Sequence, residues 1–174
     1  MIATPRPGPD EYAPSYAGYV ARIADDEDVV AVLASQLDSL GARLAGIPEA
    51  RGEYRYAPGK WSIKEVVGHL CDTERVFAYR GLRIARGDTT PLPSFDENTY
   101  VPEMRAEERT LADLAAEWGD VRRATLALFR NLPASAWRRR GVASDKAISV
   151  RALAYIIAGH VRHHVEGLDT RYGA

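Results

Sequence analysis

Apolar residues recur at spacings of three and four along four stretches of the chain, which is the period of an amphipathic helix. The first stretch, residues 27–44, opens with carboxylates, which favour a helix N-terminus. Its apolar positions are Val29, Leu33, Leu37, Leu40 and Leu44. The second predicted helix starts after Ser62 as N-cap and runs to about Arg86. Glu65, three residues after Ser62, completes a capping box.

The second half of the chain predicts two more helices. One runs from about Thr110 to Leu132, where Pro133 closes it. The other starts at Ser149 and runs to about Leu168. The segment "RRRGVASDKAIS" between them could form a short hairpin or a loop, and no convincing alternating strand pattern is present.

Two proline-containing segments flank and connect these helices. Four prolines fall in the first 14 residues, so we expect residues 1–24 to form an irregular arm before a domain of residues 25–174. The link of residues 87–109 contains three prolines. Links of this length are uncommon inside a compact domain, and they suit a crossover between helices that are not antiparallel. We therefore predict an all-α fold, a four-helix bundle with a long crossover between helices two and three.

Composition narrows the range of partners. The 174 residues fit one domain, and 23 basic against 24 acidic residues leave a net charge of -1. Bulk electrostatics therefore predicts neither a nucleic-acid nor a membrane partner. The run Arg138–Arg140 is typical of solvated surface. With a single cysteine, Cys71, no long apolar stretch and no signal-peptide pattern, we expect a cytoplasmic protein.

The histidines are the candidate functional residues, and three of the four lie within residues 159–167. At about 100° per residue, His164 falls on the apolar stripe of the last helix, His160 at its edge, and His163 about 100° away toward the outside. In the second helix, His69 lies at the boundary of the core side. His69 can therefore face the last helix across the bundle.

These positions predict a metal site. His160 and His164 are four residues apart, so they share one helix face, and His69 supplies a third imidazole. A single inward histidine is usually a hydrogen-bonded core residue, but here all except His163 point to one interior zone. Three imidazoles without cysteine suit a divalent ion such as Zn, Ni or Fe.

The residues predict a metal site, but they do not determine which reaction it carries out. Three protein ligands leave coordination positions open, as in catalytic sites, and these admit water for hydrolysis or a thiol for transfer. A non-enzymatic metal-binding or stress-response module is the third alternative. Cys71 is expected to be a packing residue. Nearby carboxylates receive no assigned role: Glu65, Asp72, Asp96, Glu97 and Glu166.

Three segments resemble one family: "WSIKEVVGHLCDTERVFAYR", "PLPSFDENTYV" and "ISVRALAYIIAGHVRHHVEGL". The resemblance, to the DinB/YfiT-like superfamily of metal-binding four-helix bundles, covers about residues 29–168. It implies that His69, His160 and His164 bind a divalent metal and that the protein is a homodimer. It also implies a small-molecule substrate, since characterised relatives include thiol transferases using bacillithiol or mycothiol, a thiol-dependent isomerase and suggested metal-dependent hydrolases. We therefore expect a low-molecular-weight thiol as co-substrate, with hydrolysis as the alternative.

Overall fold

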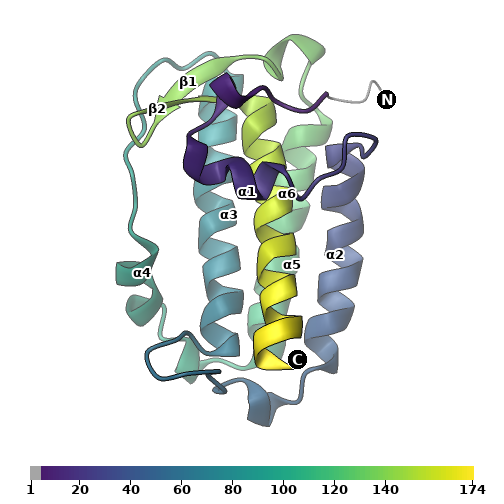
Figure 1. Ribbon diagram of the computed structural model, residues 1–174, viewed down its shortest axis with the longest axis vertical. Helices are drawn as coiled ribbons and strands as arrows, with labels where there is room; N and C mark the ends of the chain where they lie inside the picture. Colours follow the sequence, from purple (N-terminus) through teal and green to yellow (C-terminus); the bar gives the residue numbers. More distant parts are fainter. Residues whose placement is uncertain (1–4) are drawn as a thin grey trace.

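Four long helices, packed side by side, form the body of the protein (Figure 1). The computed structural model describes residues 5–174. The helices are α2 (Val29–Gly46), α3 (Ile63–Ala85), α5 (Leu111–Arg130) and α6 (Val150–Gly167). Each lies within about two residues of its predicted range at both ends, and the all-α four-helix bundle is confirmed.

Each long helix begins at a polar side chain that caps its first turn. Ser62 Oγ accepts a hydrogen bond from the Glu65 backbone N–H at 3.2 Å, and Glu65 Oε2 accepts one from the Ser62 N–H at 2.7 Å. This is the predicted capping box. Thr110 and Ser149 cap α5 and α6, and Asp28 caps α2. The helix starts could be predicted because the caps act through local hydrogen bonds.

The connections between helices follow the predicted crossover. Both α2 and α3 pack against α5 and α6, which places α2 and α3 diagonally across the bundle. α3 and α5 run in the same direction, so the link between them travels the length of the molecule (Figure 1). It contains one short helix, α4 (Glu97–Glu103).

The segment between α5 and α6 forms a hairpin of β1 (Arg140–Ala143) and β2 (Lys146–Ser149). Ser144 and Asp145 turn it with φ of 52° and 60°, a left-handed conformation that short polar residues tolerate. Leu92 of the crossover joins β1, donating its N–H to the Val142 carbonyl at 2.9 Å. Of the two alternatives that the sequence left open, the hairpin is the one observed. Four-residue strands are too short to show an alternating pattern.

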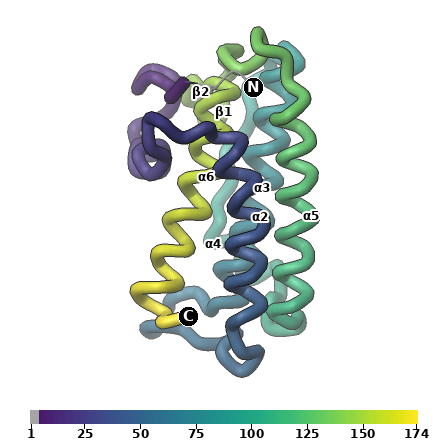
Figure 2. Tube along the Cα trace, turned by 90° about the vertical axis from the view of Figure 1, so that its right-hand side faces the viewer, coloured from purple at the N-terminus to yellow at the C-terminus, as the bar shows by residue number. Residues whose placement is uncertain are grey.

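Residues 5–24 of the predicted arm pack on the body of the protein. They form two short 3-10 turns and α1 (Ala17–Val20), a single helical turn that crosses in front of α6 in Figure 1 and lies on the outer side of α6 in Figure 2. Val20 and Ile23 are fully buried, and Glu11 pairs with Arg151 Nε at 2.8 Å. The described part of the arm contains no long element, and the division of the chain at residue 25 stays a prediction. The prediction for residues 1–4 lies outside the described residues.

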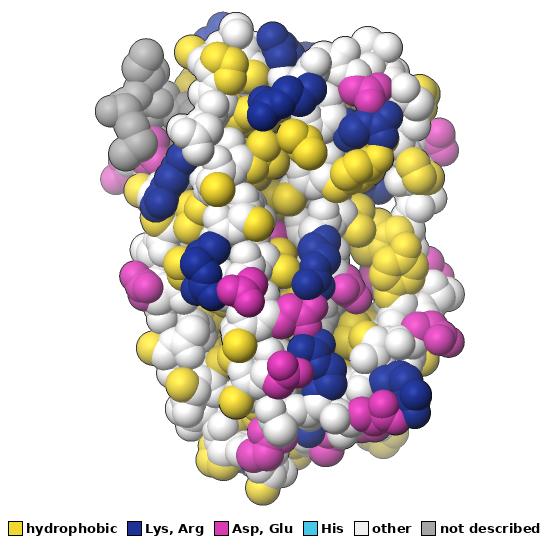
Figure 3. All heavy atoms as spheres, turned by 180° about the vertical axis from the view of Figure 1, so that it is seen from behind, with side chains coloured by type: hydrophobic (Ala, Val, Ile, Leu, Met, Phe, Trp, Pro, Cys, Tyr) yellow, Lys and Arg dark blue, Asp and Glu magenta, His cyan; other side chains and the backbone are white. Residues whose placement is uncertain are grey.

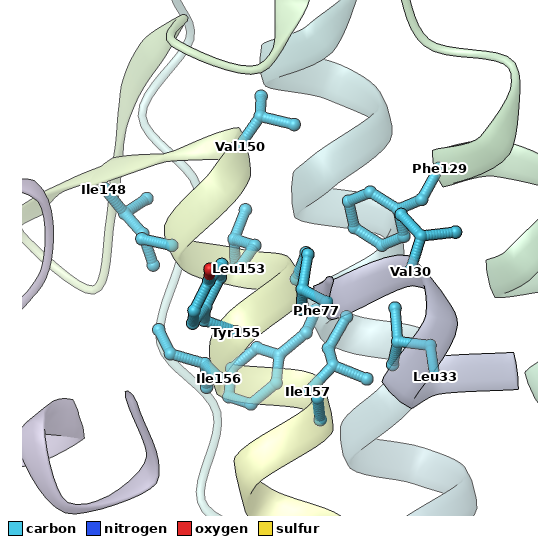
Figure 4. Close-up of a cluster of buried hydrophobic side chains, with 14 of the residues drawn as sticks. Val30, Leu33, Phe77, Phe129, Ile148, Val150, Leu153, Tyr155, Ile156 and Ile157 are labelled. Atoms are coloured by element: carbon cyan, nitrogen blue, oxygen red, sulfur yellow. The ribbon is translucent and has the colours of Figure 1, made fainter. Parts of the chain in front are cut away.

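The core consists of two apolar clusters separated by a polar layer. One cluster, near the hairpin, includes Phe77, Phe129, Leu153 and Ile157 (Figure 4). The other lies toward the chain's C-terminal end and includes Leu70, Trp118 and Val161. Between the clusters, each of the four helices contributes at least one buried polar side chain. These are Gln36 of α2, Thr73 and Glu74 of α3, Arg122 and Thr125 of α5, and His160 of α6.

Arg122 connects Glu74 and Gln36 of the polar layer through hydrogen bonds. Its guanidinium pairs with both oxygens of Glu74 at 2.8 and 2.7 Å and donates to Gln36 Oε1 at 2.7 Å. Gln36 in turn donates to the Ala158 carbonyl at 2.8 Å, two residues before His160. Because both charges are buried and fully paired, the layer fixes the register of all four helices without leaving an isolated charge.

Within residues 5–174, no helix combines the length and apolar character that crossing a bilayer requires. The face seen from behind carries both basic and acidic side chains scattered among apolar ones, with no histidine visible (Figure 3). Cys71 is buried against the Leu114 carbonyl, and burial raises the pKa of its thiol, so it is the expected packing residue.

Candidate metal centre

Three of the four histidines converge inside the bundle. His69 lies on α3, and His160 and His164 lie one turn apart on α6, the neighbouring helix. The Nε2 atom of His160 is 3.0 Å from Nε2 of His69 and 3.0 Å from Nε2 of His164. The three candidate ligand atoms all lie within 4.8 Å of one another. The structure thus brings together the three residues that helical phase selected.

The convergence of these nitrogens suits a metal ion better than it suits hydrogen bonds. A neutral imidazole has one N–H and one lone pair, so His160 Nε2 can donate a proton to only one of its two neighbours. A divalent ion accepts lone pairs from all three. Tetrahedral ligation at about 2.1 Å separates ligand nitrogens by roughly 3.4 Å, close to the observed spacing. The three histidines therefore fit a divalent ion.

Burial keeps the three rings uncharged. Desolvation lowers the pKa of His69 to about 4 and that of His164 to about 3, with the neighbouring histidines adding to the effect. The pKa of His160 is lowered well below its usual value for the same reasons. Neutral imidazoles offer the lone pairs that metal ligation needs, so the site is in its binding form at neutral pH.

Two residues of the same region contact the His69 ring. Thr73, one turn further along α3, places its Oγ1 3.3 Å from His69 Nδ1 and 3.5 Å from His69 Nε2, so the hydroxyl lies against the ring and restricts its position. Trp61 lies against the other side, with ring centroids 4.7 Å apart. Both residues stand in the predicted second helix or just before it, but periodicity assigned neither of them to the site.

α1 covers the outer side of His160. The Tyr19 ring meets the His160 ring edge-on, with centroids 5.3 Å apart. Gly159 permits this approach, because a Cβ at this position would lie 1.9 Å from the Tyr19 carbonyl oxygen. This contact could not be predicted from the sequence, because Tyr19 lies in a segment without helical periodicity and the contact joins residues far apart in the chain.

His163 stands apart from the triad, in line with its predicted outward direction. Its Nδ1 lies 3.3 Å from Arg22 Nη2, and the same nitrogen of Arg22 pairs with Glu166 at 2.9 Å. The pKa of His163 is lowered, first by partial burial and then by the charges of Arg22 and Arg171. His163 therefore belongs to the wall of the site and not to the group of converging nitrogens.

The candidate carboxylates take other roles. Glu65 completes the cap of α3 and pairs with Arg55 at 2.9 Å, and Asp96 caps α4. Asp72 lies 3.7 Å from Arg75, and burial raises the pKa of its carboxyl. Within residues 5–174, the group of side chains that converge on the triad includes no carboxylate. The site therefore offers three neutral imidazoles, and no carboxylate of residues 5–174, as candidate metal ligands.

A cavity of about 340 Å³ opens beside His164. Its walls come from the connector before α3, from the C-terminal half of α6 and from the residues that follow it. The lining includes Arg22, Tyr56, Lys60, Trp61, His164 and Arg171. The sequence predicted no cavity here, because its walls are assembled from segments that are distant in the chain.

Comparison with known proteins agrees with this fold. The sequence model of the DinB superfamily matches residues 32–167, and the chain belongs to that superfamily. Among curated protein sequences, none matches this chain at a significant level.

Three solved structures share the fold at low sequence identity. YfiT from Bacillus subtilis, described as a probable metal-dependent hydrolase with an unusual four-helix bundle topology, is 18% identical over 94% of both chains, with a TM-score of 0.71. A mycothiol-dependent maleylpyruvate isomerase is 13% identical over 84% of this chain, with a TM-score of 0.68, and the match spans 60% of that enzyme. The DinB-like protein YjoA from Bacillus subtilis is 19% identical over 84% of this chain and 90% of its own, with a TM-score of 0.60.

Proposed function

We propose that this protein binds a divalent metal ion through His69, His160 and His164 and uses it to activate a low-molecular-weight thiol for S-transfer. The observation on which the proposal rests is the convergence of three neutral Nε2 atoms, two pairs of them 3.0 Å apart. A divalent ion held there supplies positive charge that favours the anionic form of a nucleophile.

The residues around the triad support a catalytic site over a structural one. No fourth side chain among residues 5–174 joins the group to close the coordination sphere. His164 also borders the 340 Å³ cavity, which is large enough for a small organic molecule. A purely structural site would need neither feature.

Other residues of the chain position the histidine rings, cover them and hold the reacting molecule. Thr73 holds the His69 ring, and Tyr19 and Trp61 cover His160 and His69 and keep bulk water from them. The cavity beside His164 positions the reacting molecule next to the triad. These contacts fix the geometry before any substrate enters.

Hydrolysis is the second candidate, in which water replaces the thiol. Its support is the similarity to YfiT, which extends over 94% of both chains and whose description names a metal-dependent hydrolase. The isomerase that depends on mycothiol supports the thiol reaction in the same way. A non-enzymatic metal-binding module is the outcome that remains if neither reaction occurs.

A conjugation assay separates these functions. The metal-loaded protein is incubated with bacillithiol or mycothiol and 1-chloro-2,4-dinitrobenzene, so that a C–S bond forms, chloride leaves and the thiol proton passes to the buffer. We expect a rate well above that of the metal-free protein. Equal rates with and without metal for both thiols would reject S-transfer, and a panel of ester, amide and phosphate substrates then tests hydrolysis.

Metal analysis of two neighbouring histidine variants tests the ligand assignment. We expect His160→Ala to lower metal affinity by at least about tenfold, because it removes a ligand that the ion cannot replace. His163→Ala is the matched control, one turn away on the same helix and outside the triad, and it should keep its metal. Equal metal loss in both variants, measured by mass spectrometry of the desalted proteins, would contradict the assignment.

We also propose that the protein is a cytoplasmic homodimer. The single buried cysteine and the resemblance to commonly dimeric proteins support this proposal. Sedimentation equilibrium measures the mass of the particle, and cell fractionation locates it. A monomeric mass at micromolar concentration would reject the dimer.

A further inference from the structure

The cavity beside His164 contains more positive charge than its own carboxylate can balance. Three cationic side chains line it, Arg22, Lys60 and Arg171, together with a single carboxylate, Glu166. Glu166 is already paired with Arg22 at 2.9 Å. The positive charges of Lys60 and Arg171 therefore remain to be explained.

Within the described residues, neither Lys60 nor Arg171 forms an ion pair with a carboxylate. The guanidinium of Arg171 instead contacts an aromatic residue, with Nη1 3.4 Å from Tyr56 Oη and its carbon 5.8 Å from the Tyr56 ring centre. Lys60 follows Gly59, whose φ of +74° makes a tight turn before α3. Fourteen of the 23 Lys and Arg side chains pair with a carboxylate, whereas Lys60 and Arg171 leave two cationic charges of one cavity without such a partner among the described residues.

The shape of the cavity suits an organic molecule larger than a single ion. Tyr56 and Trp61 provide aromatic wall, and Trp61 also contacts His69 of the triad. A second hollow of about 250 Å³ shares Lys60, Trp61 and two further lining residues with the first. An occupant can therefore place one end beside His164 and another beside Lys60.

We propose that this cavity binds a small molecule bearing an anionic group, a carboxylate or a phosphate, held by Lys60 and Arg171 while its reactive end reaches the histidine triad. The inference rests on the proposed function for the role of the triad. The anion-binding step depends only on the cavity and its two cations, so it can be tested with or without metal.

Titration calorimetry of the metal-free protein with succinate and with inorganic phosphate tests the anion site alone. We expect binding of at least one of these probes, and a loss of affinity of about fivefold in each of Lys60→Met and Arg171→Met, as for one exposed charge pair. Arg130→Met is the control, because Arg130 is an exposed cation at the other end of the bundle. Absence of binding for both probes, or equal losses in all three variants, would overturn the proposal.

Comparison of the two probes identifies the anionic group. Stronger binding of succinate assigns a carboxylate, and stronger binding of phosphate assigns a phosphoryl group. Affinity for either should fall as salt is added, because exposed charge pairs are screened. Affinity independent of salt would contradict binding through Lys60 and Arg171.

Cobalt-loaded protein links the anion site to the triad. Mercaptosuccinate, 2-mercaptoethanol and cysteamine are anionic, neutral and cationic thiols, and the sulfur-to-cobalt absorption band reports their binding. We expect the anionic thiol to bind most tightly. In the Lys60→Met, Arg171→Met double variant, the three thiols should bind with similar affinity. Equal affinities in the unaltered protein would overturn the inference. Failure to bind cobalt would reject the proposed function instead, and the metal-free titration would still decide the anion site.

Discussion

At the scale of single residues, the site depends on keeping imidazoles uncharged inside a protein. Desolvation lowers the pKa of His69 to about 4 and that of His164 to about 3, so each ring resists protonation in the folded protein. In the unfolded chain their pKa returns to about 6.5. The difference links the stability of the metal-free protein to pH.

We predict that the metal-free protein loses stability as the pH falls from 6.5 toward 4. Below pH 6.5 the unfolded chain binds protons that the folded chain does not, so the free energy of unfolding falls. For His69 the loss reaches about 3 kcal/mol at pH 4. Urea unfolding between pH 7 and pH 5, with chelator present, measures it.

The histidine contribution can be separated from that of the carboxylates. Glu11 and Glu27 are held by arginines at a pKa of about 2, so their stabilising effect is lost only at pH values below about 4.5. His69→Gln should flatten the slope between pH 7 and pH 5. A slope unchanged by this variant would argue against a neutral, buried His69.

A hydroxyl beside the triad gives the second prediction at this scale. Thr73→Val removes the hydroxyl that lies 3.3 Å from Nδ1 and 3.5 Å from Nε2 of His69 and restricts the ring, and we expect metal affinity to fall about tenfold. Thr125→Val is a matched control, since the Oγ1 of Thr125 is buried with no hydrogen-bond partner among the described residues. Competition with a chromogenic chelator measures both affinities. Equal affinity in Thr73→Val and the unaltered protein would show that Thr73 does not orient the ring.

At the scale of elements, helical phase explains why much of the site could be predicted. Rotation of about 100° per residue places His160 and His164 on one face and His163 on another, whatever the rest of the chain does. Ser62, Thr110 and Ser149 similarly mark helix starts through contacts within four residues. Helical phase and N-cap residues depend only on nearby positions, so both could be predicted from the sequence.

The contacts of α1 could not be predicted from local sequence patterns. Tyr19 is placed by its contact with α6, about 140 residues away in the chain, and no periodic pattern surrounds it. The same is true of Arg22, which reaches Glu166, and of Lys60 and Arg171, which meet in one cavity. Only the assembled helices bring these residues together.

We predict that Gly159→Ala detaches α1 from α6. The added Cβ would overlap the backbone of Tyr19, and relief of the overlap should cost about 1–3 kcal/mol of stability. Gly41→Ala is the control, because that helical glycine has no neighbour within 4 Å and the change should stabilise by roughly 0.5–1 kcal/mol. Faster amide hydrogen exchange in residues 17–24 of Gly159→Ala checks the result, and unchanged exchange would contradict it.

At the scale of the whole molecule, the polar layer separates the two apolar clusters, and the triad extends from that layer, at His160, into the second cluster, whose members flank His69 and His164. Arg122 and Glu74 tie α3 to α5, and the triad joins α3 to α6. The middle of the bundle is thus organised by directional contacts, while its two halves are held by apolar packing.

We predict that a bound metal stabilises the entire bundle, because the unfolded chain does not bring His69 and His160 together. At 100 times the dissociation constant the gain is about 2.7 kcal/mol, which raises the melting temperature of a chain of this length by roughly 5–10 °C. Calorimetry with and without zinc measures the shift. His164→Ala should abolish it, and a shift that persists in this variant would place the metal elsewhere.

The triad is covered at His160 and His69 and open to the cavity at His164, and this arrangement has a stereochemical consequence. α1 encloses His160, Trp61 lies against His69, and the cavity borders His164, so a reactant approaches the three nitrogens from one direction. A planar carbon held in that cavity by an anchored anionic end would present the same face at every turnover. A new stereocentre formed there would accordingly have a single handedness.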